Sequence, residues 1–133
     1  GSEMCIRDRR VLTPGGKLIC STYGKKHMQE VSRLVRDFDD RIVLSADKLY
    51  ERFGRENGAD ILAPYFSRIF WESYKDSLLV PDAEPLISYI LSCHGNQNQY
   101  LLDKYKDFRG FVSRKTKDGF FITKDAGIFL CEK

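Results

Sequence analysis

Apolar runs alternate with amphipathic stretches along this chain, and the alternation predicts strands between helices. Residues 17–22 (KLICST) form an apolar run whose centre, Leu18-Ile19-Cys20, predicts a strand buried on both faces, as in a parallel sheet covered by helices. Residues 26–38 place apolar side chains at helical spacing, which predicts an amphipathic helix after that strand. A strand followed by such a helix is half of a β-α-β unit.

The segment before this strand carries a break signal. Thr13-Pro14-Gly15-Gly16 predicts the end of a helix at Val11 and a turn, because proline disfavours helix in the residue before it and glycine permits positive φ. Residues 1–9 have no periodicity. Gly1-Ser2 resembles the scar of a cleaved tag, and SEMCIRDR resembles read-through of a sequencing adapter. We therefore expect residues 1–9 to be an artefactual leader, and we base the fold on residues 10–133.

The middle of the chain predicts two short helices and a long strand. Ser45 is a candidate N-cap for a helix over residues 46–53, which Gly54 ends. A second helix over residues 57–66 is kinked or ended by Pro64. Together they predict a compact helical insertion. Residues 68–80 are rich in alternating aromatic side chains and predict a strand, in which Trp71 is a packing residue.

The last third predicts two helices and one or two strands. Asp82 is the expected N-cap of a helix that runs to residue 92, and a longer helix follows over residues 99–114. The segments FFITK and IFLCE flank Asp125-Ala126-Gly127, which predicts either a hairpin or a single strand with a bulge. In both cases Asp125 is expected to serve turn chemistry by bonding its own backbone.

Composition narrows the class of protein. A chain of 133 residues with 42% hydrophobic residues is expected to fold as one domain. The net charge of +3 comes from bases scattered among acids, so nucleic-acid binding is not expected. No apolar run approaches the roughly 20 residues that span a bilayer, so we expect no membrane partner and a cytoplasmic protein. Four dispersed cysteines and two histidines predict no metal site.

The motif R-x-L-x-P-G-G-K-L-I, which begins at Arg10, resembles the turn that enters the fifth strand of class I S-adenosylmethionine-dependent methyltransferases. The resemblance covers residues 10–133 and points to the type 11 branch, which is similar to ubiquinone and menaquinone methyltransferases. It implies an α/β fold with a Rossmann-like sheet and a small-molecule methyl acceptor. The further matching segments, in chain order, are Ser21-Thr22-Tyr23-Gly24 with His27-Met28, Phe53-Gly54, Glu56-Asn57-Gly58, and Ile122-Thr123-Lys124-Asp125-Ala126-Gly127 with Phe129.

The match lacks the half of the fold that holds the cofactor. The family binds S-adenosylmethionine with a glycine-rich turn after its first strand and an acidic residue after its second, and this chain contains no G-x-G-x-G. The resemblance thus implies the C-terminal half of a methyltransferase domain. The family sheet order 3-2-1-4-5-7-6, with its seventh strand antiparallel, would leave 5-7-6 here. No cofactor binding and no activity are expected of this chain alone.

The candidate site residues follow from the resemblance and from their positions. Tyr23 and His27 come directly after a predicted strand, where ligands bind in open α/β sheets, so in the parent enzyme they would line the acceptor pocket, with His27 a conceivable base. The favoured alternative is a solvent-facing His27, because no partner carboxylate can be assigned. Phe53, Asn57 and Tyr65 resemble a lid over the acceptor, although core packing explains the two aromatic residues better. No catalytic residue is assigned.

Two other functions compete with the methyltransferase fragment. A half-sheet exposes an edge, so the chain is alternatively a non-catalytic binding or assembly module that self-associates. In that case we expect a homodimer or larger assembly through the edge between Lys17 and Thr22. A stand-alone small-molecule binder is the third hypothesis.

Overall fold

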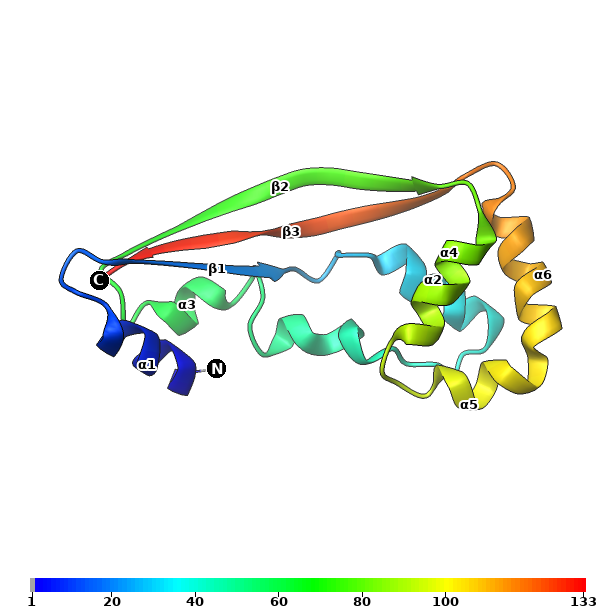
Figure 1. Cartoon of the computed structure of the whole chain (residues 1–133), viewed down its shortest axis with the longest axis horizontal. Coiled ribbons are helices and arrows are strands. Elements are labelled where there is room, and N and C mark those ends of the chain that lie inside the picture. Colours follow the sequence, from blue (N-terminus) through cyan, green and yellow to red (C-terminus); the bar gives the residue numbers. More distant parts are fainter. Residues whose placement is uncertain (1) are drawn as a thin grey trace. The chain divides into compact units, whose positions relative to one another are not determined.

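The protein has a mixed α/β fold (Figure 1). The structure is a computed structural model that describes residues 2–133, with side chains described outside residues 2–5, 45–47 and 75. The strands are β1 (Lys17–Tyr23), β2 (Arg68–Val80) and β3 (Phe120–Glu132). The helices are α1 (Ser2–Val11), α2 (Gln29–Phe38), α3 (Gly58–Leu62), α4 (Ala83–Ser92), α5 (Gln97–Leu101) and α6 (Tyr105–Thr116), with 3-10 helices η1 (Ser45–Glu51) and η2 (Leu102–Lys104).

The chain divides into two compact units, each with its own hydrophobic core. Unit 1 contains the chain up to residue 27 together with residues 48–75 and 125–133, and unit 2 contains residues 28–47 and 76–124. Strands β2 and β3 contribute residues to both units. The single domain expected from the length of the chain therefore has two separate cores.

The sheet has the strand order β1-β3-β2, so the last strand in sequence lies between the other two. Strand β3 pairs with β1 in antiparallel register, from Lys17 opposite Glu132 to Tyr23 opposite Ala126. The arrow of β2 also runs opposite to that of β3 (Figure 1). The expected order of these three strands and the antiparallel last strand are both present. Because β3 is one continuous strand, the hairpin alternative is wrong.

Strand β1 of unit 1 is entered through a tight turn. The N–H of Gly16 donates to the carbonyl of Thr13 at 2.8 Å, and Gly15 between them has φ 78°. Proline at the second position and a positive φ at the third are the features of a type II turn, which explains the sequence Thr13-Pro14-Gly15-Gly16. The helix expected to end at Val11 does end there, and it extends back to Ser2.

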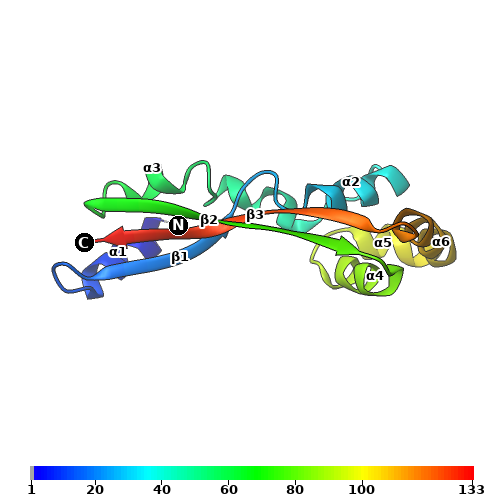
Figure 2. The same ribbon diagram turned by 90° about the horizontal axis from the view of Figure 1, so that it is seen from above.

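The core of unit 1 lies on one face of its part of the sheet. Phe129 of β3 is 1% exposed, and its ring centroid lies 4.7 Å from that of Trp71 and 5.8 Å from that of Phe53. Trp71 is therefore the packing residue that the sequence predicted. Helices α1 and α3 cover this face of the sheet, below the strands in Figure 1. In the view from above, the strands are drawn in front of α1 (Figure 2). The core residues are Leu62, Phe66, Phe129 and Cys131, with Leu12, Leu18, Cys20, Phe53, Ile61, Tyr65, Ile69 and Trp71 packed against them.

The opposite face of β1 is open, which corrects an expectation. Leu18 and Cys20 pack on the core, but Ile19 between them is 63% exposed. The prediction that residues 17–22 are buried on both faces is therefore wrong. The physical reason is that no described element of unit 1 covers the face that carries Ile19 (Figure 1).

The helical insertion is present but shorter than its pattern suggested. Residues 45–51 form a 3-10 helix in place of an α-helix over 46–53, and the proposed cap by the Ser45 side chain lies outside the described side chains. Helix α3 covers only Gly58–Leu62. Ala63 still has helical dihedrals, but Pro64 has no N–H to continue the helical hydrogen bonds.

Unit 2 is built around helices α2, α4 and α6. Helix α4 begins where expected, with the Asp82 carboxylate accepting from the N–H of Glu84 at 3.2 Å. The long helix expected over residues 99–114 is instead divided into α5, η2 and α6, because Lys104 has φ −121° and ψ 30°. The buried core comprises Val31, Leu34, Val35, Ile42, Leu44, Ala83, Leu86, Ile87, Ile90, Leu101, Phe108, Val112 and Ile122.

Helix α2 starts three residues later than expected because its entry is tied to β3. Met28 has φ 53°, and its N–H donates to the carbonyl of Thr123 at 2.7 Å. The Glu30 carboxylate accepts from the N–H of Thr123 at 2.9 Å and from its hydroxyl. Burial raises the pKa of Glu30, but these hydrogen bonds outweigh it and hold the pKa below its ordinary value.

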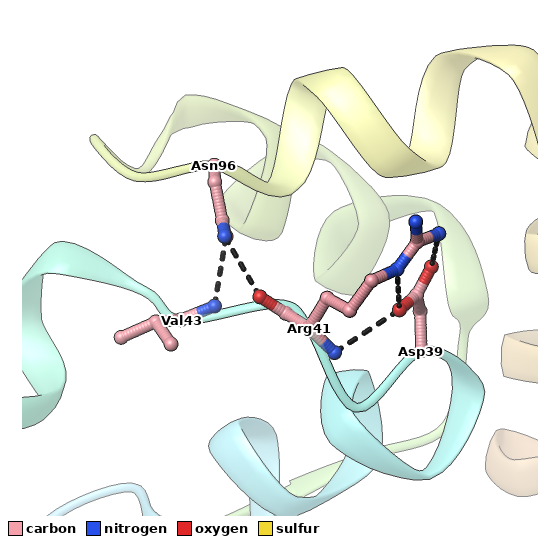
Figure 3. A network of polar contacts seen from close by, with 4 residues as sticks. All are labelled: Asp39, Arg41, Val43 and Asn96. Atoms are coloured by element: carbon pink, nitrogen blue, oxygen red, sulfur yellow. Dashed lines mark hydrogen bonds and ion pairs between the residues drawn. The ribbon is translucent and has the colours of Figure 1, made fainter.

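A polar network fixes the loop after α2 in unit 2 (Figure 3). The Asp39 carboxylate accepts from Arg41 Nε at 2.9 Å and Nη2 at 2.7 Å, a bidentate pair, and also from the N–H of Arg41. The Arg41 guanidinium lies 4.1 Å from the ring centroid of Tyr100. The Asn96 side chain donates to the carbonyl of Arg41 and accepts from the N–H of Val43. The loop is thus fixed by Asp39 at the end of α2 and by Asn96 before α5.

This network predicts a specific acid sensitivity. Hydrogen bonds from the Arg41 side chain, and then from its backbone, lower the pKa of Asp39 from 3.8 to about 2. A depressed folded-state pKa stabilises the protein above the unfolded-state pKa, so this contribution should disappear as the pH falls from about 4 to about 2. Urea unfolding of wild type and Asp39→Asn at pH 5, 3 and 2 should show a difference in stability that shrinks with pH. A stability advantage of the wild type over Asp39→Asn that stays constant down to pH 2 would contradict the prediction.

Candidate functional site

The candidate site lies in unit 1, where β1 ends. The N–H of Gly24 donates to the carbonyl of Asp125 at 2.7 Å, and the N–H of His27 donates to the carbonyl of Gly24 at 3.1 Å. These bonds close a turn that brings Tyr23 and His27 together, with stacked rings whose centroids are 4.9 Å apart. The two residues that the sequence placed after the strand therefore form one surface.

The hydrogen bond at His27 fixes its chemistry. The backbone N–H of Asp125 donates to His27 Nδ1 at 3.0 Å, so this nitrogen is an acceptor. A neutral imidazole that accepts at Nδ1 carries its proton at Nε2, which is then a hydrogen-bond donor. His27 in this arrangement supports recognition of an acceptor atom rather than the abstraction of a proton, which argues against the role of a base considered from the sequence.

Arg55 joins two acidic side chains beside this turn. Its Nε lies 3.2 Å from Asp125 Oδ1, and its Nη2 lies 3.8 Å from Glu56 Oε1. Glu56 Oε1 also accepts from the N–H of Lys25 at 3.0 Å. The carbonyl of Tyr23 accepts from the N–H of Arg55 at 3.3 Å, which holds this charged group against the end of β1.

Asp125 has an unused hydrogen-bonding capacity. Its side chain is 15% exposed, and its Oδ2 is buried with no hydrogen-bond partner among the described residues. A buried acceptor without a donor costs free energy, so Oδ2 is suited to accept from a hydroxyl or amine. The expectation of turn chemistry at Asp125 is wrong, because the residue lies inside strand β3 and pairs with Arg55.

Gly24 is the residue that this packing requires. A Cβ at this position would overlap Asp125 Oδ2 and would lie 2.8 Å from Glu56 Oε1. Any side chain would displace one of the two carboxylates. The glycine after Tyr23 therefore permits the carboxylates to approach the chain.

The insertion residues lie in unit 1 but have different surroundings. The ring of Phe53 packs in the core against Phe129, and its carbonyl accepts from the Thr22 hydroxyl at 2.7 Å. Tyr65 also packs against the core. The Asn57 side chain accepts from the N–H of Gly54 at 2.7 Å and donates to the carbonyl of Glu51 at 2.9 Å. These three residues shape and hold the insertion, whereas Tyr23 and His27 form the surface at the end of β1.

Three groups with different chemistry meet at the end of β1. The turn supplies a donor at His27 Nε2 and the aromatic ring of Tyr23, and strand β3 supplies the buried acceptor Asp125 Oδ2. Within the described part of the chain, no three histidine, cysteine, aspartate or glutamate side chains converge as metal ligands would. Sequence reasoning missed Arg55, Glu56 and Asp125 as partners, because their proximity depends on contacts between distant segments.

Comparison with known proteins gives no assignment. No model of a known protein family matches the sequence, and a search of curated proteins found no match. Among residues 2–133, every helix is too short or too polar to cross a membrane.

Proposed function

We propose that residues 10–133 are the C-terminal, acceptor-side part of a class I S-adenosylmethionine-dependent methyltransferase of the type 11 branch. The observation that carries this proposal is the sheet order β1-β3-β2 with an antiparallel β3 in the middle. Strands 5, 7 and 6 of the Rossmann-like methyltransferase sheet have the same order and direction. The turn Thr13-Pro14-Gly15-Gly16, which leads from a helix into β1, adds support at the position where the sequence motif lies.

The two edge strands support the same assignment. Strand β2 carries charged residues along its length, including Arg68, Glu72 and Asp76, as natural sheet edges do to prevent unwanted pairing. Strand β1 carries only Lys17, at its first position. A strand without such protection is typical of the interior of a sheet, which is the place of strand 5 in the methyltransferase family.

In this proposal the end of β1 faces the methyl acceptor. Tyr23 and His27 would contact a small molecule, with Asp125 as an acceptor for its hydroxyl or amine group. Phe53, Asn57 and Tyr65 would support the lid from within the insertion. Catalysis in the complete cytoplasmic enzyme would rest on alignment of donor and acceptor, since no residue here is placed as a base.

The residues present do not fit the cofactor. Binding the carboxylate of S-adenosylmethionine calls for a glycine-rich turn at the start of a helix. Gly15 and Gly16 instead lie between helix α1 and strand β1, so their N–H groups precede a strand. We therefore propose that this chain alone neither binds S-adenosylmethionine nor transfers methyl groups.

A non-catalytic assembly module is the second candidate function. It is favoured by a specific observation, the open face and unpaired edge of β1, on which Ile19 is 63% exposed. This alternative needs no cofactor and no acceptor.

The reading frame immediately upstream of residue 10 in the natural gene separates the two candidates. The methyltransferase proposal expects an in-frame segment that encodes a strand, a G-x-G-x-G turn and a helix. An in-frame stop codon followed by a natural start would overturn it and favour the assembly module.

A further inference from the structure

The register of β1 against β3 determines which backbone groups of β1 point away from the sheet. Gly24 donates to the carbonyl of Asp125, and Lys133 donates to the carbonyl of Gly16, so both pairs are hydrogen-bonded pairs of the antiparallel ladder. Such pairs alternate along the ladder. The residues between them that bond to β3 are therefore Leu18, Cys20 and Thr22.

The remaining residues of β1 direct their N–H and C=O groups outward. These are Lys17, Ile19 and Ser21, all of them exposed. In the described sheet β1 is an end strand with β3 as its one neighbour, and no backbone hydrogen bond outside the ladder reaches these three residues. At Tyr23 the outward carbonyl already accepts from Arg55, so the free edge ends at Ser21. The edge is thus a short row of three unpaired residues.

We propose that a second copy of this chain pairs with β1 along this edge, in antiparallel direction and about a two-fold axis at Ile19. In this arrangement Ile19 lies opposite Ile19 of the second copy, and Lys17 lies opposite Ser21 at each end. In each of these pairs the two residues exchange both backbone hydrogen bonds, because the N–H and C=O groups of Lys17, Ile19 and Ser21 all point outward from β1 in both copies. All the unpaired groups of the edge are satisfied at once.

Charge selects this arrangement over the other pairings. An antiparallel pair centred on Lys17 would place the two Lys17 ammonium groups directly opposite each other, and like charges directly opposite destabilise a sheet. The pair centred on Ile19 moves them to opposite ends and places each beside an uncharged serine. Among the antiparallel pairs, the one centred on Ile19 uses all three outward residues of both copies.

The open sheet face adds an apolar contribution. Ile19 lies on the same face as its cross-strand partner Leu130 and the next apolar position of β3, Ile128. On β2 the exposed Phe70 has the opposite parity to the core residues Ile69 and Trp71, so it belongs to this face as well. The two-fold axis brings the two open faces onto one side of a joined sheet, with the two Ile19 side chains in contact at its centre. The inference concerns this chain alone, because in the complete enzyme of the proposed function strand 4 would pair with the same edge of β1.

Light scattering combined with size-exclusion chromatography tests this pairing. The edge is short and buries less than the roughly 1,200 Å² of a stable interface, so we expect a reversible dimer whose mass at high protein concentration is twice the 15.4 kDa of the chain. Ile19→Lys and Ile19→Glu should each be monomeric, and an equal mixture of the two should recover the dimer, because residue 19 faces itself. Phe70→Lys is the matched control on the same face and should remain dimeric.

Hydrogen exchange on the wild type gives a readout that needs no variant. The amides of Ile19 and Ser21 should become more protected as the protein concentration rises, whereas those of Cys20 and Thr22 should be protected at every concentration. A mass of 15.4 kDa at all concentrations, a dimeric Ile19→Lys variant, a monomeric mixture, or fast exchange of Ile19 at high concentration would each overturn the proposal.

Discussion

Replacement of Phe129 by alanine is expected to lower the free energy of unfolding by about 3–5 kcal/mol, the usual cost of removing a large buried aromatic side chain. Phe129 is 1% exposed and lies at the centre of the unit 1 core. Its ring contacts Trp71 on the neighbouring strand and Phe53 of the insertion. The substitution would leave a cavity between the ring of Trp71 and the ring of Phe53. Neither aromatic side chain can change shape to fill it.

Chemical unfolding followed by Trp71 fluorescence measures this effect, since the only tryptophan lies beside the altered site. Phe121→Ala on the same strand is the matched control, because Phe121 is 54% exposed and its loss should change stability little. Equal losses for the two variants would show that Phe129 does not hold the core.

Gly127→Ala is expected to destabilise the protein by about 3 kcal/mol, although it adds only one methyl group. Gly127 is buried in β3, and a Cβ there would overlap the carbonyl oxygen of Glu72 and would lie 2.6 Å from Trp71 Cζ2. A backbone carbonyl of a paired strand cannot rotate away as a side chain can. Relief therefore requires β2 and β3 to separate.

The same substitution in helix α6 provides the control with the opposite sign. A Cβ at Gly110 would meet only Arg114 Nη1, at 3.6 Å, which is ordinary van der Waals contact. Because glycine weakens a helix interior, Gly110→Ala should stabilise the protein by about 0.5–1 kcal/mol. Thermal or urea unfolding of both variants checks the pair. A neutral Gly127→Ala would contradict the close approach of β2 to β3.

The sequence predicted correctly the elements that depend on neighbouring residues along the chain. Residues 68–80 form a strand with the expected bounds, and the helix after Asp82 begins with the expected cap. The Pro14-Gly15 turn also follows from residue chemistry alone. The strand order came from the resemblance to a family, because the pairing of β3 with β1 joins segments that are far apart in the sequence.

Features that depend on distant contacts could not be predicted. The apolar run at residues 17–22 suggested burial on both faces, but exposure of Ile19 depends on which helices cover the sheet. Asp125 beside Ala126-Gly127 resembled a turn, and only its pairing with Arg55 shows otherwise. At the site, His27 follows β1 as the sequence predicted, but Tyr23 is the last residue of the strand itself. The tautomer of His27 depends on the backbone of Asp125, 98 residues away.

The most direct test of the methyltransferase proposal is a calorimetric titration of S-adenosylmethionine into two proteins, this chain and the same chain extended upstream through its natural reading frame. The account predicts no binding to this chain, whose glycine pair precedes a strand, and micromolar binding to the extended protein. Micromolar binding to this chain alone, or no binding to the extended protein, would contradict it.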